Sequence, residues 1–254
     1  MSNLGLVSIS FRDLSVEQII DLCRKNGLKS VEWGGDTHVP HGDTERAKRV
    51  YELCENNGIS VAAYGSYYRV CPKKTVNPEW SSVLDTAACL HASVIRVWIC
   101  EQGSEETSNE EFLQAVKECR EISEAAAQRG ITVCCECHPY TLTDDYNYTM
   151  RLLKEVNHPN FKLYWQPNQF KSLQYNLDAI KAMREHIVNV HTFYWEGWER
   201  LSLKEGIDGW TAYLQELKDY PKNYLFEFMP NGTTDELPEQ IEIFKEIEGN
   251  YLRG

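Results

Sequence analysis

Hydrophobic residues along the chain follow two alternating patterns, short continuous runs and longer stretches with apolar residues three or four positions apart. The run Ile131–Cys135 lies between Gly130 and Pro139, and a short β-branched run with such boundaries fits a buried strand better than a helix. The stretch 109–128 has helical spacing, and Ser108 precedes it as a candidate N-cap. The patterns therefore predict strands and helices in alternation.

Strand followed by helix is predicted eight times. The strands are expected at residues 4–9, 30–33, 59–64, 94–99, 131–135, 161–166, 187–191 and 224–229, and the helices at about 16–25, 44–56, 77–90, 109–128, 146–156, 175–185, 209–218 and 237–247. Eight such units without a polar linker predict an α/β fold, a single-domain (β/α)8 TIM barrel over residues 1–254. A doubly wound sheet of about five or six strands would leave two units unexplained.

Polar residues stand at the ends of the last four predicted strands. Alternation along the fifth strand places Cys134, Glu136 and His138 on one face, and Cys135 and Cys137 on the other. In a barrel the carboxyl ends of the strands converge, so one cluster is expected from Glu136, Gln166, His191 and Glu227. Two carboxylates, an imidazole and an amide oxygen suit a divalent metal, Mn²⁺, Mg²⁺, Co²⁺ or Zn²⁺. Taken singly, each glutamate also fits a structural ion pair, and His191 also fits a buried histidine of the core.

Charge and composition indicate which classes of binding partner are excluded. A net charge of −12 argues against binding to nucleic acid by phosphate neutralisation, although a small phosphorylated sugar needs only one local anion site. No apolar run approaches the roughly 18 residues that cross a bilayer, so no membrane partner and a cytoplasmic location are expected. The nine cysteines fall mostly within predicted strands and helices, which predicts buried, reduced thiols.

Several motifs together resemble the xylose isomerase-like TIM barrels. They are residues 31–40 (VEWGGDTHVP), the strand end 136–139 (ECHP), His191 and Glu227. That group includes sugar phosphate isomerases and epimerases, ketose 3-epimerases, inosose dehydratases and an endonuclease IV branch. The resemblance implies a metal held by Glu136, Gln166, His191 and Glu227, and a homo-oligomer is common among such barrels. Many members have Asp-Pro-Gly-His where this chain has 166–169 (QPNQ), so one anionic ligand is lost and weaker metal binding is expected.

The resemblance implies a metal-assisted isomerase or epimerase that acts on a small sugar or sugar derivative in carbohydrate metabolism. Glu136 and Glu227 would be the catalytic pair, one removing the proton α to a carbonyl and the other returning a proton on the opposite face. An inosose-type dehydratase and a sugar-binding barrel without metal are the alternatives. A DNA endonuclease is disfavoured, because Gln166 and Gln169 stand where it would need further ligands.

Substrate recognition needs hydroxyl partners and apolar walls near the same strand ends. Burial of His38 and His41 is not expected, because their loop contains Gly and Pro. Trp33 should face the helices if Glu32 faces the barrel axis, and an inward-facing Arg96 would then pair with Glu32 in a structural role. The substrate-binding candidates are His38, His41, Tyr64, Trp98, His138, Gln169, Trp195 and Arg200.

Overall fold

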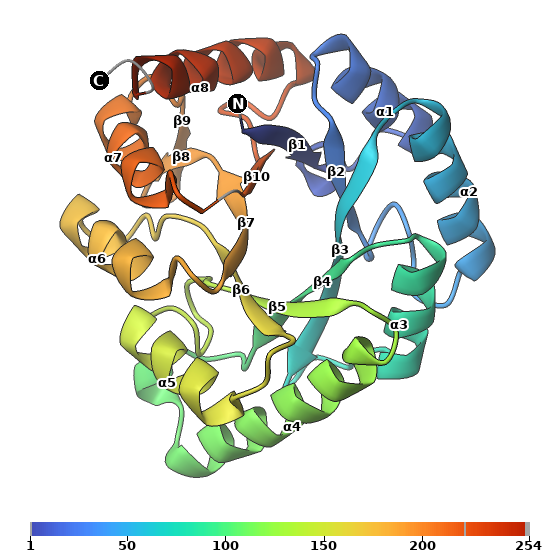
Figure 1. Cartoon of the computed structure of the whole chain (residues 1–254), viewed down its shortest axis with the longest axis vertical. Helices are drawn as coiled ribbons and strands as arrows, with labels where there is room; N and C mark the ends of the chain where they lie inside the picture. Colours follow the sequence, from blue (N-terminus) through green and yellow to red (C-terminus); the bar gives the residue numbers. More distant parts are fainter. Residues whose placement is uncertain (1, 221, 252–254) are drawn as a thin grey trace.

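The structure is a computed structural model that describes residues 2–220 and 222–251, with side chains as far as residue 249. Eight parallel strands form a closed ring, and helices surround it on the outside (Figure 1). The order around the ring is β1-β10-β7-β6-β5-β4-β3-β2, so the first and last barrel strands pair and close it. The predicted TIM barrel is confirmed; of the predicted span 1–254, residues 1, 221 and 252–254 lie outside the described part.

The barrel strands lie close to the predicted runs. They are β1 (Asn3–Val7), β2 (Ser30–Gly34), β3 (Ser60–Val70), β4 (Val94–Ile99), β5 (Thr132–Glu136), β6 (Phe161–Trp165), β7 (Ile187–Thr192) and β10 (Asn223–Phe226). The α-helices within the described residues are α1 (Val16–Lys25), α2 (Thr44–Asn56), α3 (Trp80–Cys89), α4 (Asn109–Ala127), α5 (Tyr146–Val156), α6 (Leu173–Met183), α7 (Ile207–Leu217) and α8 (Leu237–Tyr251).

Side-chain alternation along the strands divides the core into two layers. Cys134 lies in the small cluster inside the barrel, whereas Cys135 belongs to the larger cluster between barrel and helices. Trp33 also packs in the outer layer, fully buried, while Glu32 points to the barrel interior, as predicted. The register of each strand therefore decides which polar residue reaches the axis.

Two features differ from the sequence prediction. Strand β3 extends to Val70, beyond the predicted end at residue 64, and its register against β4 shifts between Gly65 and Arg69. This irregularity includes Tyr67 with φ of 55°, a conformation that apolar periodicity does not reveal. The second feature is a hairpin of β8 (Tyr194–Glu196) and β9 (Glu199–Leu201), which follows β7. Its strands of three residues are too short to give a pattern.

The nine cysteines are all free, as predicted, and six of them are buried. No helix in the part of the chain that the structure describes is long and apolar enough to cross a membrane.

Candidate active site

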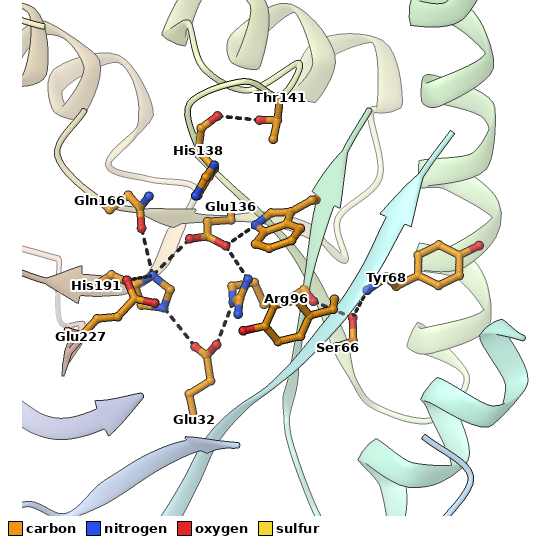
Figure 2. Close-up of polar contacts among 12 residues, drawn as sticks. Glu32, Ser66, Tyr68, Arg96, Glu136, His138, Thr141, Gln166, His191 and Glu227 are labelled. Carbon is orange, nitrogen blue, oxygen red and sulfur yellow. Dashed lines mark hydrogen bonds and ion pairs between the residues drawn. The ribbon is translucent and has the colours of Figure 1, made fainter. Parts of the chain in front are cut away.

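Three of the four predicted strand-end residues, Glu136, Gln166 and Glu227, surround the imidazole of the fourth, His191 (Figure 2). Its Nδ1 atom lies 3.0 Å from Gln166 Oε1. The same nitrogen is 3.3 Å from Glu136 Oε1 and 3.4 Å from Glu227 Oε2. The expected convergence of strand ends five to eight is confirmed, while the chemical role of each residue stays a prediction.

A buried ion-pair network supports the cluster from the opposite side of the barrel. His191 Nε2 lies 3.2 Å from Glu32 Oε2, and Arg96 Nε donates to Glu32 Oε1 at 2.7 Å. The predicted pairing of Arg96 with Glu32 is therefore confirmed. Arg96 Nη1 also donates to Glu136 Oε2, which the sequence analysis did not foresee. One guanidinium thus links the β2 and β5 carboxylates (Figure 2).

Charge compensation explains how these acids stay buried. Burial by itself raises the pKa of Glu32, but Arg96 and then His191 lower it to about 2. The pKa of Glu136 is also lowered: burial opposes ionisation, and Arg96 and His191 outweigh it. Burial raises the pKa of Glu227 to about 7, against the opposing charge of His191. The two predicted catalytic glutamates therefore have different electrostatic surroundings.

The predicted metal ligands can be compared with the geometry of a metal site. Counting only His, Cys, Asp and Glu, no group of three or more within the described residues has the arrangement of such a site. The donor chemistry nevertheless suits a divalent ion, because Glu136, Glu227 and Gln166 supply oxygens beside the His191 nitrogen. Their distances of 3.0 to 3.4 Å from Nδ1 are close to the spacing of about 3 Å between neighbouring ligands in a site with bonds of about 2.1 Å. Divalent metal binding stays a prediction.

A cavity of about 210 Å³ opens above the cluster. Two residues of its lining carry a buried polar atom, Gln169 Oε1 and Trp195 Nε1, that has no hydrogen-bond partner among the described residues. Unpaired buried polar atoms are costly, and a ligand in the cavity could satisfy them. The cavity is lined by Ile9, Arg12, Tyr67, Arg96, Trp98, Glu136, His138, Gln166, Gln169, Phe193, Trp195, Glu227 and Phe228.

The loop after β5 fixes the orientation of His138 on the cavity wall. His138 Nδ1 lies 2.7 Å from the carbonyl oxygen of Pro139, and since a carbonyl can only accept, Nδ1 carries the hydrogen. Thr141 donates to the His138 carbonyl at 2.7 Å and Thr143 to the Glu136 carbonyl at 2.5 Å. In the neutral imidazole, Nε2 is therefore the nitrogen with a free lone pair.

Four of the eight predicted substrate-binding residues line the cavity: Trp98, His138, Gln169 and Trp195. Three others lie elsewhere. Tyr64 is fully buried, donates to the Val39 carbonyl at 2.8 Å and contacts His41 Nδ1 at 2.8 Å.

The expectation that His38 is not buried is wrong. Its side chain is 2% exposed, because Nε2 donates to the Leu14 carbonyl and the ring packs on Trp33. Arg200 lies beside the cavity, over its aromatic wall.

Sequence reasoning missed several cavity residues. Arg12 follows the first strand and donates to Asp36 at 2.5 Å and to the Tyr67 hydroxyl at 3.0 Å. Phe193 and Phe228 follow β7 and β10. The positions of Arg12 and Phe193 just after predicted strand ends were a usable signal, because such residues face the mouth of a barrel, whereas Phe228 fell within the predicted strand 224–229. Phe228 has φ of 49°, and this turn ends β10 earlier than predicted.

Comparison with known proteins agrees with this fold. Residues 20–247 match the model of the xylose isomerase-like TIM barrel family, and the chain belongs to that family. Among individual relatives, it is 26% identical over 270 aligned residues to a 3-dehydroshikimate dehydratase from Bacillus anthracis, covering 94% of this chain and 95% of that protein.

Solved structures give the same fold. The probable 3-DHS dehydratase AsbF of petrobactin synthesis from Bacillus anthracis superposes with a TM-score of 0.81 at 21% identity, over 96% of this chain and 99% of that one. The IolI protein with a bound zinc atom superposes with a TM-score of 0.74 at 16% identity, over 98% of this chain and 97% of that one. At these identities the structural likeness shows the fold alone.

Proposed function

We propose that this protein is a dehydratase that removes water from a small, cyclic, polyhydroxylated ketone, with 3-dehydroshikimate as the first substrate to test. The observation that carries the proposal is the unequal engagement of the two glutamates. Both oxygens of Glu136 are occupied, Oε2 by Arg96 and by Trp98 Nε1 at 2.5 Å, and Oε1 by His191. Among the described residues, the Glu227 carboxylate has a polar contact with His191 alone, through Oε2. The 26% identical dehydratase supports the same reaction class.

Epimerisation by two glutamates needs an acid–base group on each face of the substrate. Glu136 is a poor proton carrier because three donors hold its charge, so only one of the predicted pair remains suited to proton transfer. Glu227 is therefore one of the two proton carriers. The other is His138 rather than Glu136, because His138 Nε2 is free to accept a proton.

Dehydration by these residues proceeds as follows. His138 Nε2 takes the proton α to the carbonyl, and the C–H electrons form the enolate. The enolate then expels the β-hydroxyl: the C–O bond breaks, a C=C bond forms, and the departing oxygen takes a proton from Glu227 to leave as water. Glu136, Gln166, His191 and Glu227 are the residues that would hold a divalent ion. When bound, such an ion would polarise the carbonyl oxygen as a Lewis acid.

Product mass separates the candidate reactions. The wild type, supplied with Mn²⁺, should convert 3-dehydroshikimate to a product lighter by one water, seen by mass spectrometry. His138→Gln should lower turnover by about 100-fold or more, because it removes the base. His158→Gln is the matched control, since His158 pairs with Glu124 at the surface and should leave turnover unchanged.

Two results would contradict the dehydratase. One is no loss of water from 3-dehydroshikimate with any of Mn²⁺, Mg²⁺, Co²⁺ or Zn²⁺. The other is a product that has the mass of the substrate in ordinary water and gains deuterium when the reaction runs in heavy water. That result would restore the isomerase or epimerase interpretation.

A further inference from the structure

The β8–β9 hairpin places a cation beside the aromatic wall of the cavity. Trp195 and Arg200 are directly opposed in its antiparallel register. The Arg200 guanidinium carbon lies 5.2 Å from the Trp195 ring centroid and 4.6 Å from that of Phe228. Both rings line the cavity, so the hairpin brings Arg200 to its edge even though Arg200 itself is exposed.

Arg200 differs from the other two arginines at the cavity. Arg96 is bound to Glu32 and Glu136, and Arg12 is bound to Asp36. For Arg200 no ion pair or side-chain hydrogen bond is found with any described residue, and its guanidinium lies over the two rings. Stacking leaves the in-plane N–H groups of a guanidinium available, and these groups match a carboxylate.

A second donor on the same hairpin also lacks a partner. Trp195 Nε1 is buried without an acceptor among the described residues. The wall of the cavity has two carboxylates, Glu136 and Glu227, and two guanidinium groups, Arg12 and Arg96, which already have carboxylate partners. The hairpin therefore offers, at the edge of the cavity, a guanidinium and an indole N–H without acceptors among the described residues.

We propose that Arg200, with the indole N–H of Trp195, forms a subsite for a carboxylate on the substrate, and thereby selects carboxylated rings over neutral sugars. The proposal rests on the proposed function in that the ligand occupies the same cavity. It assigns specificity to the hairpin and proton transfer to the strand ends, so the two can be tested separately.

Binding of two ligands that differ only in the carboxylate tests the subsite. Protocatechuate, the aromatic product that dehydration of 3-dehydroshikimate yields, carries the carboxylate, and catechol is the same ring without it. By calorimetry the wild type should bind protocatechuate more tightly than catechol. Arg200→Gln should weaken protocatechuate binding by about 10- to 100-fold, the worth of a charge-assisted hydrogen bond, and leave catechol binding unchanged.

Three further variants complete the experiment. Arg200→Lys should recover part of the preference, because it keeps the charge and loses the planar fork. Trp195→Phe keeps an aromatic wall and removes the donor, so it should reduce the preference by a smaller factor. Arg49→Gln removes the same charge from an exposed position on α2 and should behave as wild type.

Failure of the subsite and failure of the proposed function give different results. A wild type that binds protocatechuate no more tightly than catechol overturns the subsite, whether or not it dehydrates 3-dehydroshikimate. An Arg200→Gln variant that keeps the full preference also overturns it. A wild type that shows the Arg200-dependent preference but releases no water supports the subsite and contradicts the dehydratase.

Discussion

At the scale of single residues, the absence of one side chain makes room for the buried ion pairs. A Cβ added to Gly65 would lie 2.6 Å from Glu32 Oε1 and 2.9 Å from Arg96 Nη2. Glycine at this point of β3 therefore lets the pair reach its distance of 2.7 Å. Because Arg96 also holds Glu136, the effect of this glycine extends to the candidate site.

Gly65→Ala should destabilise the protein by about 1–3 kcal/mol, because the added methyl group overpacks the Glu32–Arg96 contact. The free energy of unfolding in urea measures this. Gly249→Ala is the control: a Cβ there meets nothing within 4 Å, and alanine in α8 should stabilise by about 1 kcal/mol or less. Equal stability of wild type and Gly65→Ala would show that the pair can shift at no cost.

Strand periodicity was enough to predict which residues point inward, including Glu32, Glu136 and Arg96. The pair of Arg96 with Glu32 was predicted, but its second contact with Glu136 was not, because parity alone does not show that both carboxylates lie within reach of one guanidinium. His38 shows the opposite limit. Its loop contains Gly and Pro, yet a backbone acceptor at Leu14 and the ring of Trp33 make its burial favourable, and local composition carries no trace of either contact.

At the scale of elements, three loops at the mouth of the barrel meet through exposed aromatic rings. Trp198, in the turn of the β8–β9 hairpin, stacks on Tyr140 with centroids 6.0 Å apart and an interplanar angle of 2°. Phe170, in the loop after β6, lies 5.0 Å from Trp198 and 6.2 Å from Tyr140. The hairpin is thus held against the loops that follow β5 and β6, the loops that carry His138 and Gln169.

Trp198→Ala should loosen the hairpin without unfolding the barrel. Trp198 is 70% exposed, so its loss should hardly change global stability, but aromatic pairs are worth about 0.5–1.5 kcal/mol. Amide hydrogen exchange in residues 194–201 should therefore quicken by about 2- to 10-fold. Tyr51→Ala, which removes a surface ring stacked on His91, should leave exchange in the hairpin unchanged. Unaltered exchange in Trp198→Ala would mean that the rings do not hold the hairpin.

The regular elements could be predicted because each carries its own periodic signal, and the barrel then follows from their number and order. The hairpin and the extension of β3 could not. Both depend on pairing rather than on pattern: three residues a side give no alternation, and the shift after Gly65 is defined only against β4. These two irregular elements carry Tyr67, Trp195 and Arg200. Trp195 and Arg200 were predicted as candidates from their place after the seventh strand, but the pairing that positions them was not.

At the scale of the whole molecule, the candidate site gathers residues from strands all round the ring. Glu32 belongs to β2, Glu136 to β5 and His191 to β7, and Glu227 follows β10. Sequence order and strand parity were sufficient to predict this gathering. The fourth donor is the neutral amide of Gln166, so the site has one negative charge fewer and should bind a divalent ion more weakly.

Removal of divalent ions tests the predicted ligands by stability as well as by activity. Dialysis against EDTA should abolish turnover, and Mn²⁺ should restore it. At an ion concentration about 100 times the Kd, binding to the folded state alone should stabilise it by about 2.7 kcal/mol and raise the unfolding temperature. His191→Gln should lose this rise. An unfolding temperature that no divalent ion changes would indicate a barrel that binds its ligand without metal.

Closure of the ring has a consequence for the newly made chain. Strand β10 is hydrogen-bonded to β1 and to β7, and Glu227 comes immediately after it. While the ribosome is adding residue 200, neither the strand that fills the gap between β1 and β7 nor the last carboxylate has been made. The candidate site is therefore incomplete during synthesis until β10 and Glu227 have been added and have left the ribosome.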